Sequence, residues 1–269
     1  MSDRTTHKKL TIAIAQLDSV WENPEANQQQ VEKVVATTAR KAVDFIVFPE
    51  MFLTGFSMRV ALYSSTADIL FFQKLARKHA VGIIIGLGVK EKHARVGENQ
   101  AVVISKTGKL LSQYNKIHPF SFAQEHTAIR AGVQLPTFKI AGHKAACVIC
   151  YDLRFPGLFE VLAKQRIELL FVIANWPQAR IADWRTLLRA RALDMQSFVI
   201  GVNRVGTANG LLYPGYSSVY GPRGEKIIEM TKKGVQLVCI EPTAVRVARN
   251  SFPSLRDKKF SVYQKLNKK

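Results

Sequence analysis

The chain has few cysteines and no long apolar run. Three cysteines in 269 residues, an odd number without an export signal, argue against a disulfide framework, so any reactive cysteine is expected to act as a free thiol. The longest apolar run, residues 81–89, contains three glycines and has about half the length of a bilayer span. Residues 1–9 are polar and lead to no cleavage site. We therefore expect a cytoplasmic protein that does not enter the membrane.

Acidic residues are also scarce. The chain has 39 Lys and Arg against 20 Asp and Glu, a net charge of +19. Most of the excess lies in residues 61–150, with 12 basic and 4 acidic groups, and in residues 151–269, with 20 and 9. Such a field attracts nucleic acids and other anions without selecting one. The basic residues are mostly single and do not form a stripe interleaved with aromatics, so any binding of nucleic acid is expected to be non-specific at most.

Short apolar segments alternate with amphipathic ones from end to end. No repeat or linker divides the sequence, so we expect one domain over residues 1–269. Strands are predicted at 10–16, 44–48, 82–86, 99–105, 110–114, 137–140, 144–149, 169–174 and 198–203, and helices at 24–41, around 69–75, from 156 and at 181–196. The turn 221–224 predicts a last hairpin. This order indicates a layered α/β domain with hairpins inserted between βα units.

Three ionisable residues follow predicted strands directly. They are Glu50, Lys116 and Cys150. Reactive groups in α/β folds gather at the carboxyl ends of strands. A thiol needs a nearby base to become a nucleophile, and a developing oxyanion needs a fixed donor or cation, so these three residue types together suffice for acyl transfer.

Each of these residues also has a structural interpretation. A carboxylate after a strand is usually solvated, a lysine is usually on the surface, and Cys150 alone is more often a small buried side chain. The spacing of Cys147 and Cys150 matches redox and zinc motifs, but no second Cys/His pair lies nearby. We interpret Cys147 as a core residue and expect no metal site.

The segments around the three residues resemble the signature segments of the nitrilase (carbon–nitrogen hydrolase) superfamily. They read Phe-Pro-Glu-Met at 48–51, Tyr-Asn-Lys-Ile-His at 114–118 and Cys-Tyr-Asp-Leu-Arg-Phe-Pro at 150–156. The similarity covers nearly the whole chain. Ala-Asn-Trp-Pro at 174–177 and Arg-Asn-Ser-Phe-Pro at 249–253 look most like the bacterial omega-amidase branch, whose members hydrolyse the terminal amide of 2-oxo acid amides.

The resemblance implies a fold and a set of catalytic roles. The fold would be a four-layer αββα sandwich of two mixed sheets flanked by helices. Glu50 would be the general base and Cys150 the nucleophile that forms a thioester. Lys116 and the backbone N–H of Tyr151 would hold the oxyanion, and Glu125 would orient Lys116 and the substrate. Neither a cofactor nor a metal would be required.

The resemblance also implies a substrate and a partner. Trp176, Arg154 and Asn175 match pocket positions, and either Arg154 or Arg180 would bind a substrate carboxylate. The expected substrate is a small amide such as 2-oxoglutaramate, with an N-carbamoyl compound, a deaminated peptide amide or a nitrile as alternatives. A homodimer is expected. The alternative from another class is a basic nucleic-acid-binding protein on an inactive hydrolase scaffold.

Overall fold

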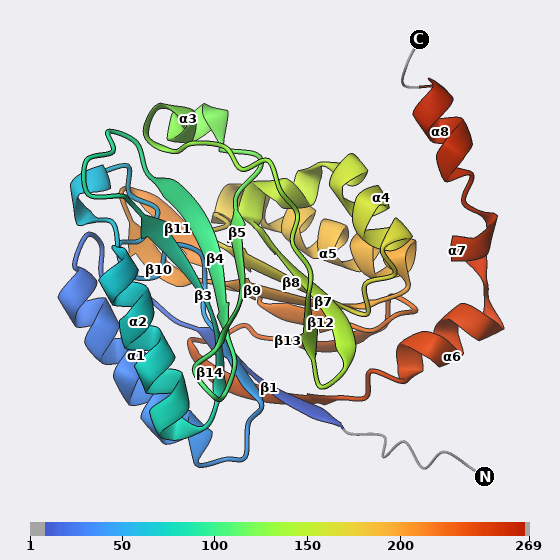
Figure 1. Ribbon diagram of the computed structural model, residues 1–269, viewed down its shortest axis with the longest axis horizontal. Helices are drawn as coiled ribbons and strands as arrows, with labels where there is room; N and C mark the ends of the chain where they lie inside the picture. Colours follow the sequence, from blue (N-terminus) through green and yellow to red (C-terminus); the bar gives the residue numbers. More distant parts are fainter. Residues whose placement is uncertain (1–8, 267–269) are drawn as a thin grey trace.

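Two mixed sheets form the centre of the computed structural model, which describes residues 9–266 (Figure 1). Within those residues each sheet has six strands, in the orders β14-β1-β2-β3-β4-β5 and β13-β12-β9-β8-β7-β6. The first sheet contains β1 (Leu10–Gln16), β2 (Phe45–Val47), β3 (Gly82–Val89), β4 (Glu98–Ile104), β5 (Leu110–Asn115) and β14 (Gly234–Ile240). The second contains β6 (Phe138–Ile140), β7 (His143–Ile149), β8 (Leu169–Ala174), β9 (Phe198–Asn203), β12 (Ser218–Tyr220) and β13 (Lys226–Glu229).

Helices cover the outer face of each sheet. The helices α1 (Pro24–Ala39) and α2 (Thr66–His79) lie on the first sheet, and α4 (Pro156–Lys164) and α5 (Ile181–Met195) lie on the second (Figure 1). The start of α1 follows from its sequence, since the Asn23 side chain accepts the Ala26 N–H at 3.1 Å and Pro24 occupies the first turn. The predicted four-layer αββα sandwich is confirmed.

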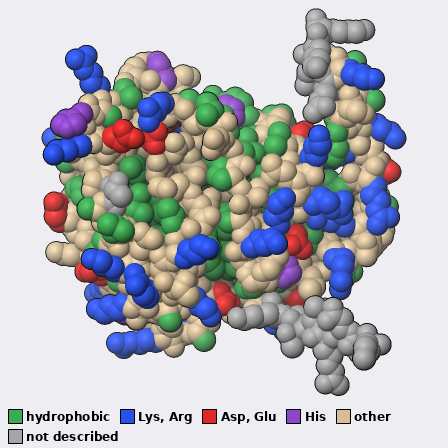
Figure 2. Space-filling view, viewed as in Figure 1, with side chains coloured by type: hydrophobic (Ala, Val, Ile, Leu, Met, Phe, Trp, Pro, Cys, Tyr) green, Lys and Arg blue, Asp and Glu red, His purple; other side chains and the backbone are tan. Residues whose placement is uncertain are grey.

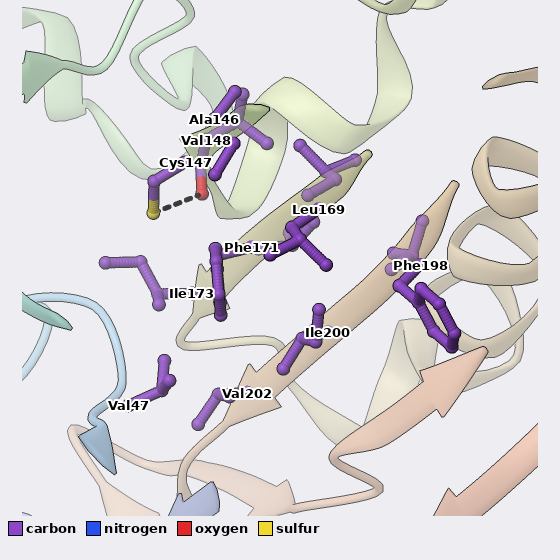
Figure 3. Close-up of a cluster of buried hydrophobic side chains, with 14 of the residues drawn as sticks. Val47, Ala146, Cys147, Val148, Leu169, Phe171, Ile173, Phe198, Ile200 and Val202 are labelled. Atoms are coloured by element: carbon purple, nitrogen blue, oxygen red, sulfur yellow. Dashed lines mark hydrogen bonds between the residues drawn. The ribbon is translucent and has the colours of Figure 1, made fainter. Parts of the chain in front are cut away.

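Alternation along the strands places two apolar layers. In β1, Ile12 and Ile14 pack between the sheets, whereas Ala13 and Ala15 pack toward α1 and α2. Between the sheets, Val47 of β2 faces the apolar side chains of β8 and β9 (Figure 3). Cys147 of β7 belongs to this layer and is 2% exposed, as expected of a core residue.

Most predicted elements are present, with ends shifted by a few residues. The strand expected at 44–48 covers Phe45–Val47, and that expected at 82–86 extends to Val89. Sequence reasoning missed β14, which pairs antiparallel with β1, and a hairpin of β10 (Val205–Ala208) and β11 (Leu211–Pro214). It also missed the C-terminal helices α6 (Ala244–Ser251), α7 (Ser254–Asp257) and α8 (Phe260–Leu266), which lead away from the sheets (Figure 1).

The surface reflects the unbalanced charge. Lys and Arg outnumber Asp and Glu on the face shown in Figure 2 and are spread across it, with a group near the C-terminal helices. This pattern agrees with the scattered distribution along the sequence. Among residues 9–266, no helix is both long enough and apolar enough to cross a membrane.

Candidate active site

Three side chains at strand ends meet where the two sheets face each other. Glu50 follows β2 and Lys116 follows β5, both in the first sheet, whereas Cys150 follows β7 in the second. The Lys116 Nζ lies 2.8 Å from Glu50 Oε1, and both side chains are fully buried. Cys150 is half-buried, and its Sγ lies 4.0 Å from the carbonyl oxygen of Asn175, whose N–H donates to Glu50 Oε2 at 2.8 Å. The structure thus brings together the three residues predicted from the strand ends.

A tight turn fixes Glu50. Met51 has a φ of +45°, and the neighbouring strand β3 supports the turn through Gly86, whose N–H donates to Pro49 O at 3.1 Å. A Cβ on Gly86 would lie 2.4 Å from Glu50 Cα, so only glycine allows this close approach. Both carboxylate oxygens are occupied. Oε1 accepts from Lys116 and from Asn99 Nδ2, at 2.8 Å each, and Oε2 accepts the Asn175 N–H at 2.8 Å.

A second buried carboxylate holds Lys116 from the other side. Glu125 begins the short helix α3 (Glu125–Ala128), and its Oε2 lies 2.9 Å from Lys116 Nζ. Asn99 Nδ2 donates to Glu125 Oε1 at 2.9 Å, and the Phe120 N–H donates to Oε2 at 2.5 Å. Asn99 therefore bridges the two carboxylates, and the lysine ammonium is fixed between them.

The charges in this cluster determine two protonation states. Burial alone would lower the pKa of Lys116, but the negative charges of Glu125 and Glu50 outweigh it and raise that pKa well above 10.5. Burial raises the pKa of the Cys150 thiol well above 9.0, and the charge of Glu50 raises it further against the opposing effect of Lys116. At neutral pH the resting site therefore contains an ammonium and a neutral thiol.

Cys150 occupies a strained position at the end of β7. Its φ is +47°, a left-handed conformation that costs a non-glycine residue roughly 1–2 kcal/mol. The chain continues as a short 3-10 helix, Cys150–Arg154. Tyr151 lies in its first turn, where backbone N–H groups lack an acceptor within the helix. The N–H of Tyr151 therefore suits the role of an oxyanion donor beside the sulfur.

A buried aspartate links the Cys150 turn to the Lys116 segment. Asp152 is 0% exposed, and its Oδ2 accepts from the Tyr114 hydroxyl at 2.7 Å and from the Ile149 N–H at 3.0 Å. Its Oδ1 accepts the His118 N–H at 3.1 Å and lies 2.8 Å from His118 Nδ1. The residues before Cys150 and on both sides of Lys116 therefore share one anchor.

A cavity of about 490 Å³ opens beside Cys150. Six of its 18 lining residues are aromatic, and the lining also contains two arginines and an Arg59–Glu22 ion pair of 2.6 Å. The lining residues are Trp21, Glu22, Phe56, Ser57, Met58, Arg59, Phe120, Ala123, Cys150, Tyr151, Arg154, Asn175, Trp176, Pro177, Arg180, Asn209, Leu211 and Tyr213. The volume is in the range of small-molecule sites.

The four residues expected to bind substrate all line this cavity. Asn175 also holds Glu50, because its Nδ2 donates to Glu50 O at 2.7 Å, while its buried Oδ1 has no partner among the described residues. Trp176 stacks against Arg154, whose guanidinium lies 5.1 Å from the ring and 2.6 Å from Asp183 Oδ2. Arg180 lies over Phe120 at 5.3 Å, and no carboxylate of residues 9–266 forms an ion pair with it.

Three polar residues of the site were missed by sequence reasoning. Asn99 and Asp152 hold the reacting groups, and Tyr213 lines the cavity from β11. Asp152 lies within the Cys-Tyr-Asp-Leu-Arg segment, so the motif itself was a signal for it. Asn99 and Tyr213 carried no comparable signal. The described residues contain no cluster of three His, Cys, Asp or Glu side chains that could hold a metal ion.

The chain is similar to known proteins over most of its length. The family model for carbon–nitrogen hydrolases matches residues 11–249. An omega-amidase from Escherichia coli is 32% identical over 251 residues, 92% of this chain and 96% of its own. A 2-oxoglutaramate amidase from Bacillus subtilis is 29% identical over 260 residues, 95% and 100% of the two chains. A solved structure from Xanthomonas campestris, a member of the superfamily with an arsenic adduct in its active site, has a TM-score of 0.86 at 28% identity and covers 94% of this chain and 98% of its own.

Proposed function

The chain belongs to the carbon–nitrogen hydrolase family, and several of its relatives are named amidases. We propose that this amide hydrolase is an omega-amidase that releases ammonia from a 2-oxo acid amide such as 2-oxoglutaramate. The observation that carries the proposal is the buried Lys116 ammonium, held at 2.8 Å and 2.9 Å between Glu50 and Glu125 beside the Cys150 thiol. An isolated buried charge is unfavourable, so such a cluster indicates a site built for chemistry.

In the first step, the Cys150 sulfur attacks the amide carbonyl carbon. The carbon–sulfur bond forms, the thiol proton moves to Glu50, and the carbonyl electron pair moves onto oxygen. The raised pKa of the thiol disfavours a preformed thiolate and favours proton transfer that accompanies the attack. Lys116 Nζ and the Tyr151 N–H stabilise the oxyanion, and Glu125 keeps the ammonium in position.

In the second step, the tetrahedral intermediate collapses. The carbon–nitrogen bond breaks, Glu50 returns its proton to the leaving nitrogen, and ammonia departs to leave a thioester on Cys150. Glu50 then takes a proton from water, which attacks the thioester, and the sulfur recovers a proton as the carbon–sulfur bond breaks. The overall reaction converts one amide and one water into one carboxylic acid and one ammonia.

Arg180 is the cation that we assign to a substrate carboxylate. It lines the cavity and has no ion-pair partner among the described residues, so its donors are available. Arg154 lines the same cavity, but Asp183 already takes one of its donors at 2.6 Å. A guanidinium binds a carboxylate through two parallel hydrogen bonds, which suits a dicarboxylic acid monoamide.

Three further parts of the proposal concern the whole protein. A cytoplasmic location and a single domain over residues 1–269 stay predictions. A homodimer formed through helices near the catalytic strands is a further prediction, and its interface would cover the half-exposed Val161 on α4 and Leu193 on α5. Light scattering of the purified protein tests the dimer directly, and a monomer at micromolar concentration would exclude it.

Ammonia release from a substrate panel tests the function. The panel contains 2-oxoglutaramate, butyramide, an N-carbamoyl amino acid, a deaminated peptide amide and a nitrile, and the Cys150→Ala variant is the control for background hydrolysis. We expect the highest kcat/KM with 2-oxoglutaramate. A clear preference for another member would leave amide hydrolysis standing and overturn the substrate. Peptide mapping after iodoacetamide treatment adds an independent test, since labelling of Cys150 should abolish ammonia release, whereas labelling of the exposed Cys239 should not.

A further inference from the structure

Tyr213 is the one residue of β11 whose side chain is buried. Its neighbours Leu211 and Leu212 are 47% and 53% exposed, whereas Tyr213 is 3% exposed and pairs with Gly206 across the β10–β11 hairpin. The ring lines the cavity beside Cys150. The hairpin therefore inserts a phenol into the wall of the active-site cavity.

The hydroxyl of Tyr213 has no hydrogen-bond partner within the described part of the chain. Two other buried tyrosines differ, because Tyr63 donates to Ser57 O at 2.8 Å and Tyr114 donates to Asp152 at 2.7 Å. The buried Tyr220, whose hydroxyl also has no partner among the described residues, does not line the cavity. The Tyr213 oxygen is also not among the sealed side-chain atoms that lack a partner, so it keeps access to the cavity. An unpartnered donor in an otherwise buried side chain indicates a place for a ligand acceptor.

The surroundings fix the ring and keep it protonated. The Arg204 guanidinium lies 4.7 Å from the ring centroid and is itself held by Asp18 at 2.7 Å and by Ser19 O at 3.1 Å. Burial raises the pKa of Tyr213 to about 12 against the opposing positive charge of Arg204, and the negative charge of Glu50 acts in the same direction as burial. The phenol is therefore a rigid neutral donor within electrostatic range of the reacting groups.

We propose that Tyr213 is a substrate-positioning and specificity residue, which donates a hydrogen bond to an oxygen on the acyl part of the amide. The ligand class is an amide whose acyl chain carries a 2-oxo or carboxylate oxygen. β11 packs against the 3-10 turn Gln178–Arg180, and Tyr213 and Arg180 both line the cavity, so the two donors would bind one anionic end of the substrate while Cys150 meets the amide. This assignment rests on the proposed amide hydrolysis.

The Tyr213→Phe variant tests the assignment through a ratio of kcat/KM values. The ratio compares 2-oxoglutaramate with butyramide, which has no oxygen beyond its amide. Loss of one donor to a charged or oxo acceptor should lower this ratio by about 10- to 100-fold. Tyr220→Phe is the matched control, because Tyr220 of β12 is 4% exposed and lies outside the cavity lining. An unchanged ratio in Tyr213→Phe, or an equal fall in Tyr220→Phe, would overturn the assignment.

Protection of Cys150 gives a test that does not depend on turnover. The product 2-oxoglutarate should slow iodoacetamide labelling of Cys150, and Tyr213→Phe should raise the concentration for half-protection by about 10-fold or more. Absence of protection in the wild type, or equal protection in the variant, contradicts the role of Tyr213. A wild type that is protected but releases no ammonia would overturn the proposed function alone. Since the hydroxyl has no partner to lose, the melting temperature of Tyr213→Phe should not fall.

Discussion

Replacing Gly86 with alanine should reduce turnover although Gly86 does not line the cavity. A Cβ at this position would lie 2.4 Å from Glu50 Cα, 2.7 Å from Met51 N and 2.8 Å from Pro49 O. These are backbone atoms, so no side-chain rotation relieves the clash. Ordinary contact begins at 3.4 Å, and the Glu50 turn must therefore move by about 1.0 Å, the difference between 3.4 Å and 2.4 Å.

The expected loss follows from this displacement. Glu50 Oε1 now lies 2.8 Å from Lys116 Nζ, and a shift of about 1 Å in a positioned catalytic group costs on the order of 10²-fold in rate. Overpacking should also lower the free energy of unfolding by about 1–3 kcal/mol. The assay is kcat/KM for ammonia release at a temperature where urea titration shows the variant to be folded.

Two glycines supply controls. A Cβ on Gly82, in the same strand, would lie 2.4 Å from a ring atom of Phe45 and not from the Glu50 turn, so Gly82→Ala should be destabilised with little loss of kcat. A Cβ on Gly157 meets nothing within 4 Å, and Gly157→Ala should leave stability and activity nearly unchanged. A folded Gly86→Ala variant with activity within about threefold of wild type, or a Gly82→Ala variant equally impaired, would refute the reasoning.

Three other predictions concern the thiols and the second carboxylate. Cys150→Ala should abolish ammonia release without lowering the melting temperature. Cys147→Ala removes a core sulfur and should lower the free energy of unfolding by about 1 kcal/mol while kcat is kept. The reverse pattern would exchange the two roles. Glu125→Gln keeps an acceptor for Lys116 but removes a charge that raises the pKa of Cys150. Iodoacetamide should therefore label Cys150 faster at a fixed pH, while kcat falls by about 10²-fold. Slower labelling would contradict this electrostatic account. In the folded protein the pKa of both thiols is raised above 9.0, so the unfolded chain loses these protons first. The free energy of unfolding should therefore decline as the pH rises through 9.0. A rise in the urea midpoint over that range, measured against the double alanine variant, would contradict this prediction.

The candidate reacting groups could be located from the sequence because each lies at the end of a strand that is evident from its composition. Segments such as Phe45–Val47 and His143–Ile149 contain runs of apolar and β-branched residues with charged or turn residues beside them. When two such sheets pack face to face, strand ends from both meet at one edge. Spacing along the chain therefore located Glu50, Lys116 and Cys150 without any knowledge of the contacts between them.

Other parts of the structure depend on pairings that local patterns do not carry. β14 pairs with β1 from the far end of the chain, and nothing in the apolar sequence of β14 identifies this distant partner. The hairpin that holds Tyr213 is short and carries two exposed leucines, which removes the alternation that indicates an inward side chain. Asn99 has its role only because β4 lies beside β5, which places its amide between Glu50 and Glu125.

The charge balance of the cluster explains why geometry matters more here than the acidity of the thiol. Glu50 and Glu125 counted as carboxylates and Lys116 as an ammonium leave one net negative charge beside Cys150. That charge opposes a resting thiolate, in agreement with the raised pKa of Cys150. A stored thiolate is therefore not the source of reactivity. The base must already lie along the path of the proton when a carbonyl arrives, and this requirement accounts for the number of backbone and amide donors that hold Glu50 in place.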